Sequence, residues 1–187
     1  MRVIAGEMRS IKLAAPNGYD TRPTSDKVKE TLFNVLMPYI YSDSCFLDLF
    51  AGSGAIGIEA LSRGAKRAVF AERSKAALKC IEENIKKCRL EDRTKVISGD
   101  VFFTLRKLEG DEDFDIIFLD PPYDTGTEKE VIKYLDTSGL LRDDGIIIAE
   151  SSSDTDYDFL SGTGFEAFKV KEYKNNKHVF MRREQNG

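Results

Sequence analysis

Residues 48–57 read DLFAGSGAIG and contain the glycine pattern GxGxxG. An apolar run typical of a buried strand precedes them at 45–50, and a helical pattern follows at 53–64. Glycines at such a turn let the backbone approach a ligand closely and let the helix begin tightly against the sheet. Glu72 follows Gly52 by 20 residues, where a carboxylate can accept both hydroxyls of a ribose. The stretch therefore predicts a nucleoside-type ligand; the alternative is a tight turn beside a surface glutamate.

The rest of the chain alternates in the same way between short apolar runs and segments of helical spacing. The predicted strands lie at 45–50, 67–72, 94–100, 114–120, 145–151, 165–173 and 177–183, and the helices at 53–64, 74–90, 101–108 and 128–139. Continuous apolar strands that alternate with helices predict an α/β fold, a doubly wound and mostly parallel sheet of seven strands covered on both faces. The last two strands face each other across the turn KNN and add an antiparallel hairpin at the edge.

The N-terminal part differs from this alternation. Residues 1–16 predict two short strands around Gly6, and a helix is expected to begin near Ser25. A length of 187 residues, with no repeat and no linker, predicts one domain. We expect a small β-hairpin extension at 1–24 and the α/β core at 25–187.

The composition is that of an ordinary globular protein, with 41% apolar and 32% charged residues. No apolar run has the length of a membrane span and the first residues lack the apolar stretch of a signal peptide, so we expect a cytoplasmic protein. Cys45, Cys80 and Cys88 match no metal motif and are interpreted as reduced, structural thiols. His178 is the only histidine. It leaves little room for a histidine-rich metal site or a Ser-His-Asp triad, and we expect no metal.

The charges are unevenly distributed around a net charge of −4. Acidic residues outnumber basic ones in 100–165, whereas basic residues outnumber acidic ones in 1–30, 63–95 and 166–187. Two explanations fit this pattern equally well: solvated helix faces, or a basic surface that meets phosphates.

Asp48 indicates which nucleoside the glycine loop takes. A dinucleotide would place its pyrophosphate at the start of the helix, whereas S-adenosylmethionine has no phosphate and carries a positive sulfonium and an amino-acid end. The carboxylate of Asp48, four residues before Gly52, suits that positive end and would repel a pyrophosphate. Asp100 could bond the adenine amino group, with Val101 beside the ring; Asp100 also suits the N-cap of the next helix, and both roles can coexist.

Residues 118–123 read FLDPPY, an apolar strand that ends in an acid, two prolines and a tyrosine. The prolines fix two φ angles and push Asp120 into an extended conformation. The fourth strand of a doubly wound sheet ends beside the ligand crevice. Two acceptors, the Asp120 carboxylate and the Pro121 carbonyl, and the flat face of Tyr123 suit a planar group that bears an amine. The alternative is that the prolines simply end the strand.

The order of glycine loop, Glu72, Asp100 and DPPY resembles class I S-adenosylmethionine-dependent methyltransferases with a Rossmann-like sheet that modify exocyclic amines. Four stretches together resemble the RsmD family more closely, over nearly the whole chain. They are MRVIAGEMRSIKL, TRPTSDKVKETLFNVL, DLFAGSGAIGIEALSRGA and FLDPPY. Enzymes of that family methylate N2 of a guanine in 16S ribosomal RNA of the bacterial small subunit.

The resemblance implies a set of site residues. For the cofactor, S-adenosylmethionine, they are Asp48, Phe50, Gly52, Ser53, Gly54, Glu72, Arg73, Asp100 and Val101. For the target amine they are Asp120, Pro121, Pro122 and Tyr123, and Arg22 and Thr24 would lie near the mouth of the site. If the substrate is RNA, the basic charges have a use: we hypothesise that Arg2, Arg9 and Lys12, with Arg22 and Lys27, hold its phosphates. The implied partner is 16S ribosomal RNA or the assembled small subunit, and we expect a monomer.

Other functions remain open at this point. A DNA adenine-N6 methyltransferase shares the glycine loop and a proline-tyrosine motif, but this chain has no spare segment for a DNA-reading domain. A methyltransferase that acts on another amine, such as a protein glutamine, is a related alternative. An NAD-dependent oxidoreductase uses the same glycine pattern, but would give DPPY no role and would place Asp48 near phosphates.

Overall fold

A computed structural model of the chain describes residues 1–16, 25–123 and 125–184, and it has the predicted alternation of strands and helices. The helices are α1 (Asp26–Leu36), α2 (Ala55–Ser62), α3 (Lys75–Cys88), α4 (Val101–Leu108) and α5 (Thr127–Thr137), with short 3-10 turns η1 (Met37–Tyr39), η2 (Glu91–Arg93) and η3 (Asp158–Gly162). The strands are β1 (Cys45–Leu49), β2 (Arg67–Glu72), β3 (Thr94–Ser98), β4 (Phe114–Leu119), β5 (Leu141–Ser152), β6 (Phe165–Glu172) and β7 (Asn176–Arg183).

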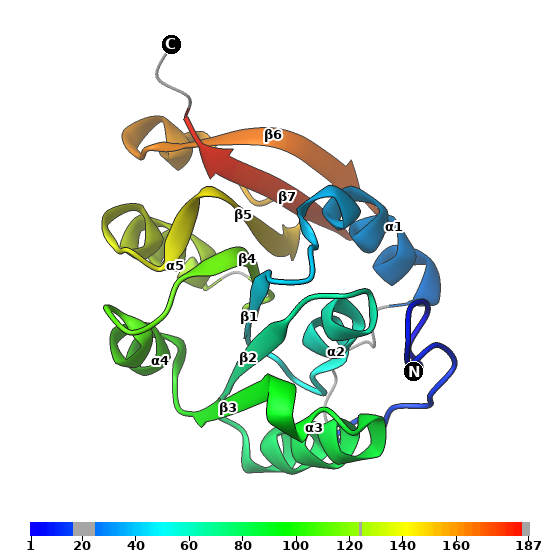
Figure 1. Cartoon of the computed structure of the whole chain (residues 1–187). Helices are drawn as coiled ribbons and strands as arrows, with labels where there is room; N and C mark the ends of the chain where they lie inside the picture. Colours follow the sequence, from blue (N-terminus) through cyan, green and yellow to red (C-terminus); the bar gives the residue numbers. More distant parts are fainter. Residues whose placement is uncertain (17–24, 124, 185–187) are drawn as a thin grey trace.

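The strands form one seven-stranded sheet in the order β3-β2-β1-β4-β5-β7-β6 (Figure 1). β1 to β5 are parallel, and β7 pairs antiparallel with both β5 and β6. The predicted doubly wound sheet with an antiparallel C-terminal edge is therefore confirmed. The strand order reverses between β1 and β4, and the carboxyl ends of these two strands border the crevice where such sheets bind ligands.

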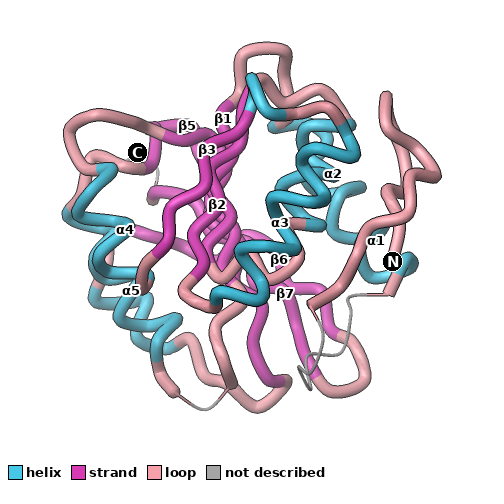
Figure 2. The backbone as a smooth tube through the Cα atoms, turned by 90° about the horizontal axis from the view of Figure 1, so that it is seen from below, coloured by secondary structure: helices cyan, strands magenta, loops and turns pink. Residues whose placement is uncertain are grey.

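Helices cover both faces of the sheet, with α1, α2 and α3 on one face and α4 and α5 on the other (Figure 2). Each face has its own apolar core. β1 is buried at every position because it lies in the middle of the sheet with a helix layer on each side. None of the helices in the described ranges is long and apolar enough to cross a membrane.

Three helices begin where the sequence predicts a start, and each has a side-chain cap. The side chains of Ser25, Ser74 and Asp100 each accept a hydrogen bond from a backbone N–H in the first turn of the helix that follows. β5 is longer than predicted and begins at Leu141. Its early residues pair with Phe114 across a register shift, a tertiary pairing that the polar sequence Arg-Asp-Asp does not suggest.

In the N-terminal segment, residues 1–14, the two predicted arms pair only briefly. An antiparallel bridge joins Arg2 to Lys12, with the Val3 N–H bonded to the Ile11 carbonyl and the Leu13 N–H to the Met1 carbonyl. The arms do not extend into full strands toward Gly6, because another element takes the next backbone donors. The carboxylate of Glu59 on α2 accepts hydrogen bonds from Ile4 N–H at 2.8 Å and Ala5 N–H at 3.0 Å. A backbone that bonds to α2 in this way has fewer groups left for a β ladder.

A buried ion network fixes this segment and α1 to α2. The Glu59 side chain is fully buried and lies 2.8 Å from the Arg63 guanidinium and 3.3 Å from Lys29 Nζ. Lys29 also donates to the backbone carbonyl of Arg2. Burial lowers the pKa of Lys29, and the neighbouring Glu59 carboxylate opposes that effect. Charges buried to this extent are tolerated because each has partners.

We expect Glu59→Gln to lower the free energy of unfolding by about 3 kcal/mol or more, because it leaves Lys29 and Arg63 without a buried counter-charge. Urea denaturation of the whole chain measures this. Glu83→Gln serves as the control, since Glu83 is exposed and 4.0 Å from Lys79 in a surface pair, which should contribute little. Equal losses in the two variants would contradict a special role for the buried network.

Candidate active site

Three carboxyl groups lie at the carboxyl edge of adjacent parallel strands. Asp48 is in β1, Asp120 directly follows β4, and Glu150 is near the end of β5. Asp48 pairs with Phe118, and Phe118 pairs with Ile148. Asp120 and Glu150 each follow two residues later, so they lie at one level and on the same face of the sheet. Parallel strand register thus brings like charges together at the point where the strand order reverses.

The glycine loop turns sharply between β1 and α2. Phe50, Gly52 and Gly54 have positive φ angles of 64°, 57° and 75°, which is unusual for the phenylalanine. Gly57 packs so closely on Phe70 that an added Cβ would lie 2.4 Å from the ring. Its N–H donates to the Asp48 carboxylate at 2.9 Å. The loop is therefore fixed by close packing as well as by backbone conformation.

Glu72 lies beside this loop, as predicted. One carboxylate oxygen accepts the Gly52 N–H at 2.9 Å, and the other accepts the N–H groups of Arg73 and Ser74 at 2.8 Å. The carboxylate thus holds the glycine loop and the start of α3 together. Since each carboxylate oxygen has about two lone-pair sites, the oxygen bound to Gly52 can accept a further hydrogen bond.

Asp48 is nearly inaccessible to solvent, with 2% of its surface exposed. Burial raises the pKa of its carboxyl from about 3.8 to about 7, the hydrogen bond from Gly57 opposes this, and the Glu72 charge adds to it. A buried carboxyl with so little compensation favours a positive group close by.

Asp120 is the least compensated of the three acids. Within the described ranges, no hydrogen bond reaches its carboxylate. Burial and the charges of Glu150 and Asp48 raise its pKa well above the usual value. The carbonyl of Pro122 accepts from the Thr125 hydroxyl at 2.8 Å, whereas the Pro121 carbonyl has no such partner among the described residues. Both acceptors proposed from the sequence are therefore left unpaired in the described part of the structure.

Tyr123 has an exposed ring, 44% accessible, but an anchored hydroxyl. The hydroxyl donates to the Glu150 carboxylate at 3.1 Å, and Glu150 also bonds Asn176 Nδ2 at 2.5 Å and His178 Nε2 at 2.9 Å. Burial would raise the pKa of Glu150, but the hydrogen bond and charge of His178 and the bonds from Asn176 and Tyr123 keep it below its usual value. Sequence reasoning missed Glu150, Asn176 and His178, whose contacts depend on the pairing of β5 with β7.

The end of β3 lies next to Glu72, because Gly99 N–H bonds the Glu72 carbonyl at 3.0 Å. Asp100 is exposed and caps α4 through the Phe103 N–H at 2.9 Å, which confirms the capping interpretation. Val101 is buried. The ring of Phe103, 45% exposed, packs against Gly99. Phe103 was not among the predicted site residues, although an aromatic residue three positions after Asp100 was a visible signal.

The N-terminal segment reaches the glycine loop. The Ser53 hydroxyl lies 3.7 Å from the Met1 sulfur, and the Ser53 carbonyl accepts from Asn84 Nδ2 at 2.9 Å. The Asn84 side chain also bonds the backbone of Ala14 twice: its Oδ1 accepts the Ala14 N–H and its Nδ2 donates to the Ala14 carbonyl. An open hollow of about 390 Å³ here is lined by Met1, Arg2, Lys12 and Asp26. Arg2 and Lys12 therefore line a hollow beside Met1, which contacts the predicted cofactor loop. Arg9 follows Met8, whose N–H bonds the Ser62 hydroxyl at the end of α2.

The basic residues predicted to bind RNA differ in exposure and in their ion pairs. Arg2 pairs with Asp26 at 2.8 Å, and Arg9 and Lys12 are exposed. Lys87 of α3 donates to the Lys12 carbonyl and adds a further cation to this side. Arg22 and Thr24 lie outside the described residues.

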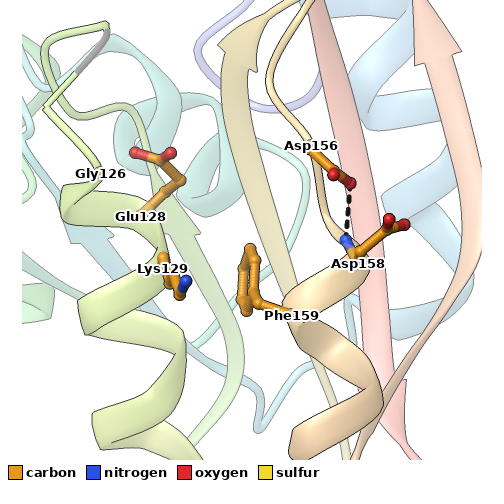
Figure 3. Close-up of a pocket in the computed structure, with 6 residues that line it drawn as sticks. All are labelled: Gly126, Glu128, Lys129, Asp156, Asp158 and Phe159. Carbon is orange, nitrogen blue, oxygen red and sulfur yellow. Dashed lines mark hydrogen bonds between the residues drawn. The ribbon is translucent and has the colours of Figure 1, made fainter.

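A second hollow, of about 310 Å³, lies between the start of α5 and the segment that follows β5 (Figure 3). Figure 3 shows the Lys129 side chain close to the Phe159 ring, 5.7 Å from its centroid. The other residues lining it are Gly126, Glu128, Asp156 and Asp158. Because acids predominate here, this hollow is a poor place for phosphates, and an RNA backbone is expected on the N-terminal side instead.

The three cysteines lie in the interior of the protein. Cys45, Cys80 and Cys88 are free and buried, and burial raises the pKa of Cys80 and Cys88. They are structural thiols, as predicted. Among the described residues, no group of His, Cys, Asp and Glu side chains could hold a metal ion.

Comparisons with known proteins relate nearly the whole chain to one group. The family model described as "Conserved hypothetical protein 95" matches residues 1–182. The chain is 40% identical over 156 residues to Ribosomal RNA small subunit methyltransferase D of Haemophilus influenzae, covering 82% of this chain and 80% of that protein. Its counterpart from Escherichia coli K12 is 39% identical over 151 residues, covering 81% and 74%. A solved structure of a candidate methyltransferase from Escherichia coli has a TM-score of 0.84 at 33% identity, covering 98% of each chain.

We expect Asp48→Asn to stabilise the protein at neutral and alkaline pH. The raised pKa of Asp48, about 7 against 3.8, means that folding favours the protonated carboxyl. This contribution is complete below pH 4 and is lost as the pH rises through 7. Asparagine keeps an acceptor for the Gly57 N–H and carries no charge. The gain in unfolding free energy should grow between pH 4 and 7 and level at roughly 1–3 kcal/mol.

Urea denaturation at several pH values measures this gain. Asp154→Asn is the control, because Asp154 is exposed and its replacement should give no gain that depends on pH. A difference between Asp48→Asn and wild type that is constant with pH would contradict the expected cost of a buried charge.

Proposed function

The chain belongs to the RsmD family, and from that membership we propose that it transfers a methyl group from S-adenosylmethionine to an exocyclic amine of ribosomal RNA, N2 of a guanine in 16S RNA. The observation that carries this proposal is the carboxyl edge of β1 and β4. There, Asp120 and the Pro121 carbonyl have no hydrogen-bond partner among the described residues and lie beside the exposed ring of Tyr123. Such a site offers acceptors and a stacking face, which are the features that an aromatic amine requires.

The residues around the glycine loop fit the cofactor. When bound, S-adenosylmethionine supplies a methyl group on a positive sulfonium. An amine nitrogen can attack the methyl carbon, and the sulfur leaves as a neutral thioether. The buried and weakly compensated carboxyl of Asp48 favours such a positive group. It would disfavour the pyrophosphate of a dinucleotide, which weighs against the oxidoreductase alternative. We assign the cofactor to the nine predicted residues, Asp48, Phe50, Gly52, Ser53, Gly54, Glu72, Arg73, Asp100 and Val101.

Asp120 and Pro121 act on the amine by position and charge. Their oxygens accept the two N–H groups of the exocyclic amine, whose lone pair is otherwise delocalised into the base, and favour a pyramidal nitrogen. The proline pair fixes the geometry of these acceptors before the base arrives, which is the general advantage of a preorganised polar site. Tyr123 stacks on the base, which must leave its own stack to enter the site.

The RNA approaches over the N-terminal segment. Arg2 and Lys12 line the hollow beside Met1, and Arg9 is exposed in the same N-terminal segment. We assign all three to phosphates. We keep Arg22 and Thr24 as proposed contacts at the mouth of the site. The protein would act as a cytoplasmic monomer on 16S RNA or the assembled small subunit.

The experiment that tests this function is transfer of labelled methyl from S-adenosylmethionine to small ribosomal subunits that lack their native modification, followed by nucleoside analysis. Label in N2-methylguanosine is the expected result. Label in N6-methyladenosine would overturn the choice of base, and absence of label from RNA with cofactor binding intact would overturn the choice of substrate.

In the same assay, Asp120→Ala should lower kcat by roughly 10²- to 10³-fold, the effect of removing one positioned polar group. Cofactor affinity, measured by calorimetry, should change little, because Asp120 is assigned to the amine. A large loss of cofactor binding with little change in kcat would place Asp120 in the wrong part of the site.

Charge reversal of Arg9 and Lys12 to Glu should lower kcat/KM for RNA by about tenfold or more at low salt, with kcat nearly unchanged. Arg106→Glu with Lys133→Glu is a matched control, since these residues are exposed on α4 and α5, on the opposite face of the sheet (Figure 2). If the two double variants lose equal activity, the RNA does not use the N-terminal segment.

A further inference from the structure

We propose that Glu150 is a positioning residue of the methyl-transfer site: it holds the Tyr123 ring in place through the tyrosine hydroxyl and is itself held by His178 and Asn176 of the C-terminal hairpin. The inference rests on the proposed function, in which Tyr123 stacks on the target base. It assigns a role in that function to the antiparallel edge of the sheet.

Strand register brings the group together. Glu150 of β5 pairs directly with His178 of β7, and Ser152 pairs with Asn176, two residues further along the same strands. Side chains two residues apart lie on one face of a strand. Glu150, His178 and Asn176 therefore point to the same face, and this is also the face that continues to Asp120. No close spacing in the sequence links them, since β5 and β7 are separated by β6.

The Glu150 carboxylate lies at the centre of the group. The Glu150 carboxylate is 7% exposed and takes three partners, the Tyr123 hydroxyl at 3.1 Å, Asn176 Nδ2 at 2.5 Å and His178 Nε2 at 2.9 Å. A carboxylate can accept about four such bonds and donates none when ionised. All three partners therefore donate to Glu150, and the hydrogen on the tyrosine oxygen points toward the acid.

His178 has support of its own. It is fully buried, and its Nδ1 lies 3.2 Å from the Tyr173 hydroxyl at the turn between β6 and β7. The rings of Phe118 and Phe180 meet its ring edge-on, with centroids 6.1 and 6.4 Å away. Nε2 donates to Glu150, and Nδ1 lies within hydrogen-bonding distance of the Tyr173 hydroxyl, which can donate or accept. The histidine is thus fixed at both nitrogens and cannot turn away from the acid.

The bond to Glu150 restricts the orientation of the Tyr123 ring. Its ring is 44% exposed and follows two prolines. An exposed aromatic side chain normally samples several rotamers, and a stacking face that moves loses part of its binding free energy to ordering. The bond to a buried, immobile carboxylate fixes one orientation before the base arrives. Asp120, at the same level of the sheet as Glu150, then faces a ring in a constant position.

A double-mutant cycle of Tyr123→Phe and Glu150→Ala tests the proposal by methyl transfer to RNA. Tyr123→Phe keeps the ring and removes only its anchor, and it should lower kcat/KM roughly 10-fold or more. Glu150→Ala should lower it by at least as much, and the double variant by no more than Glu150→Ala alone. Glu150→Gln, which can still accept the hydroxyl, should recover part of the activity. Tyr134→Phe is the matched control, because the Tyr134 hydroxyl bonds Glu109 away from the site, and it should behave as wild type.

A second measurement does not depend on activity. The hydroxyl carbon of tyrosine, labelled with carbon-13, reports ionisation of each tyrosine by NMR, and Tyr123→Phe identifies the resonance of Tyr123. Burial and the neighbouring Glu150 raise the pKa of Tyr123. In Glu150→Ala, and to a smaller extent in Glu150→Gln, Tyr123 should therefore ionise at lower pH than in wild type.

The outcomes separate the two proposals. No methyl transfer by the wild type would overturn the proposed function, whereas the NMR titration could still establish the Tyr123–Glu150 bond. If the wild type is active, two results would overturn the positioning role alone. One is that the losses of kcat/KM in the two single variants multiply in the double variant, and the other is that Glu150→Ala leaves the titration of Tyr123 unchanged. If Glu150→Ala does not fold, wild-type activity in Tyr123→Phe would still overturn it.

Discussion

Like charges at one edge of the sheet are the constraint on which the rest of the site depends. Parallel register places Asp48, Asp120 and Glu150 at the ends of three adjacent strands, where each would raise the pKa of its neighbours. The protein compensates them unequally. Glu150 has three donors and Asp48 has one backbone N–H, whereas Asp120 has none among the described residues. What the fold leaves uncompensated is an acceptor beside an open surface, an arrangement that suits a ligand with a positive charge or an amine.

Helix α2, which like α4 has only eight residues, links the two sides of this site. Its first residues follow the glycine loop, and its later residues, Glu59 and Ser62, hold the N-terminal segment. Every residue of α2 is buried, so the helix cannot shift without disturbing both. A segment that is basic and exposed on its outer side is thereby fixed relative to the cofactor loop by a rigid element. This arrangement suits the capture of a large polyanion, whose position over the site must be set before one of its bases can be presented.

The sequence predicted those features that depend on local pattern. Apolar runs gave the strands, Ser25, Ser74 and Asp100 gave the helix starts, and the distance from the glycine loop to Glu72 placed that acid correctly. The predictions failed where contacts between residues far apart in the sequence determine the local structure. The two ends of the N-terminal segment pair as a short hairpin, but Glu59, more than fifty residues away, takes the N–H groups of Ile4 and Ala5, so the pairing does not extend into strands. Glu150 and His178 meet through a pairing of strands 28 residues apart, and a lone histidine in a strand gives no sign of its partner.

The direction of β7 explains why the C-terminal edge can serve the site. In a parallel sheet each strand ends at the carboxyl edge and the chain returns through a helix on one face. Because β7 runs the other way, its first residues, Asn176 and His178, lie at that edge beside the end of β5, and so does the turn that carries Tyr173. A hairpin therefore delivers two donors to Glu150 and one support to His178 from a single turn. A further parallel strand would deliver only its own last residues. The antiparallel strand β7 thus adds hydrogen-bond donors at the carboxyl ends of the parallel strands, where three acidic side chains lie close together and the parallel strands supply few donors of their own.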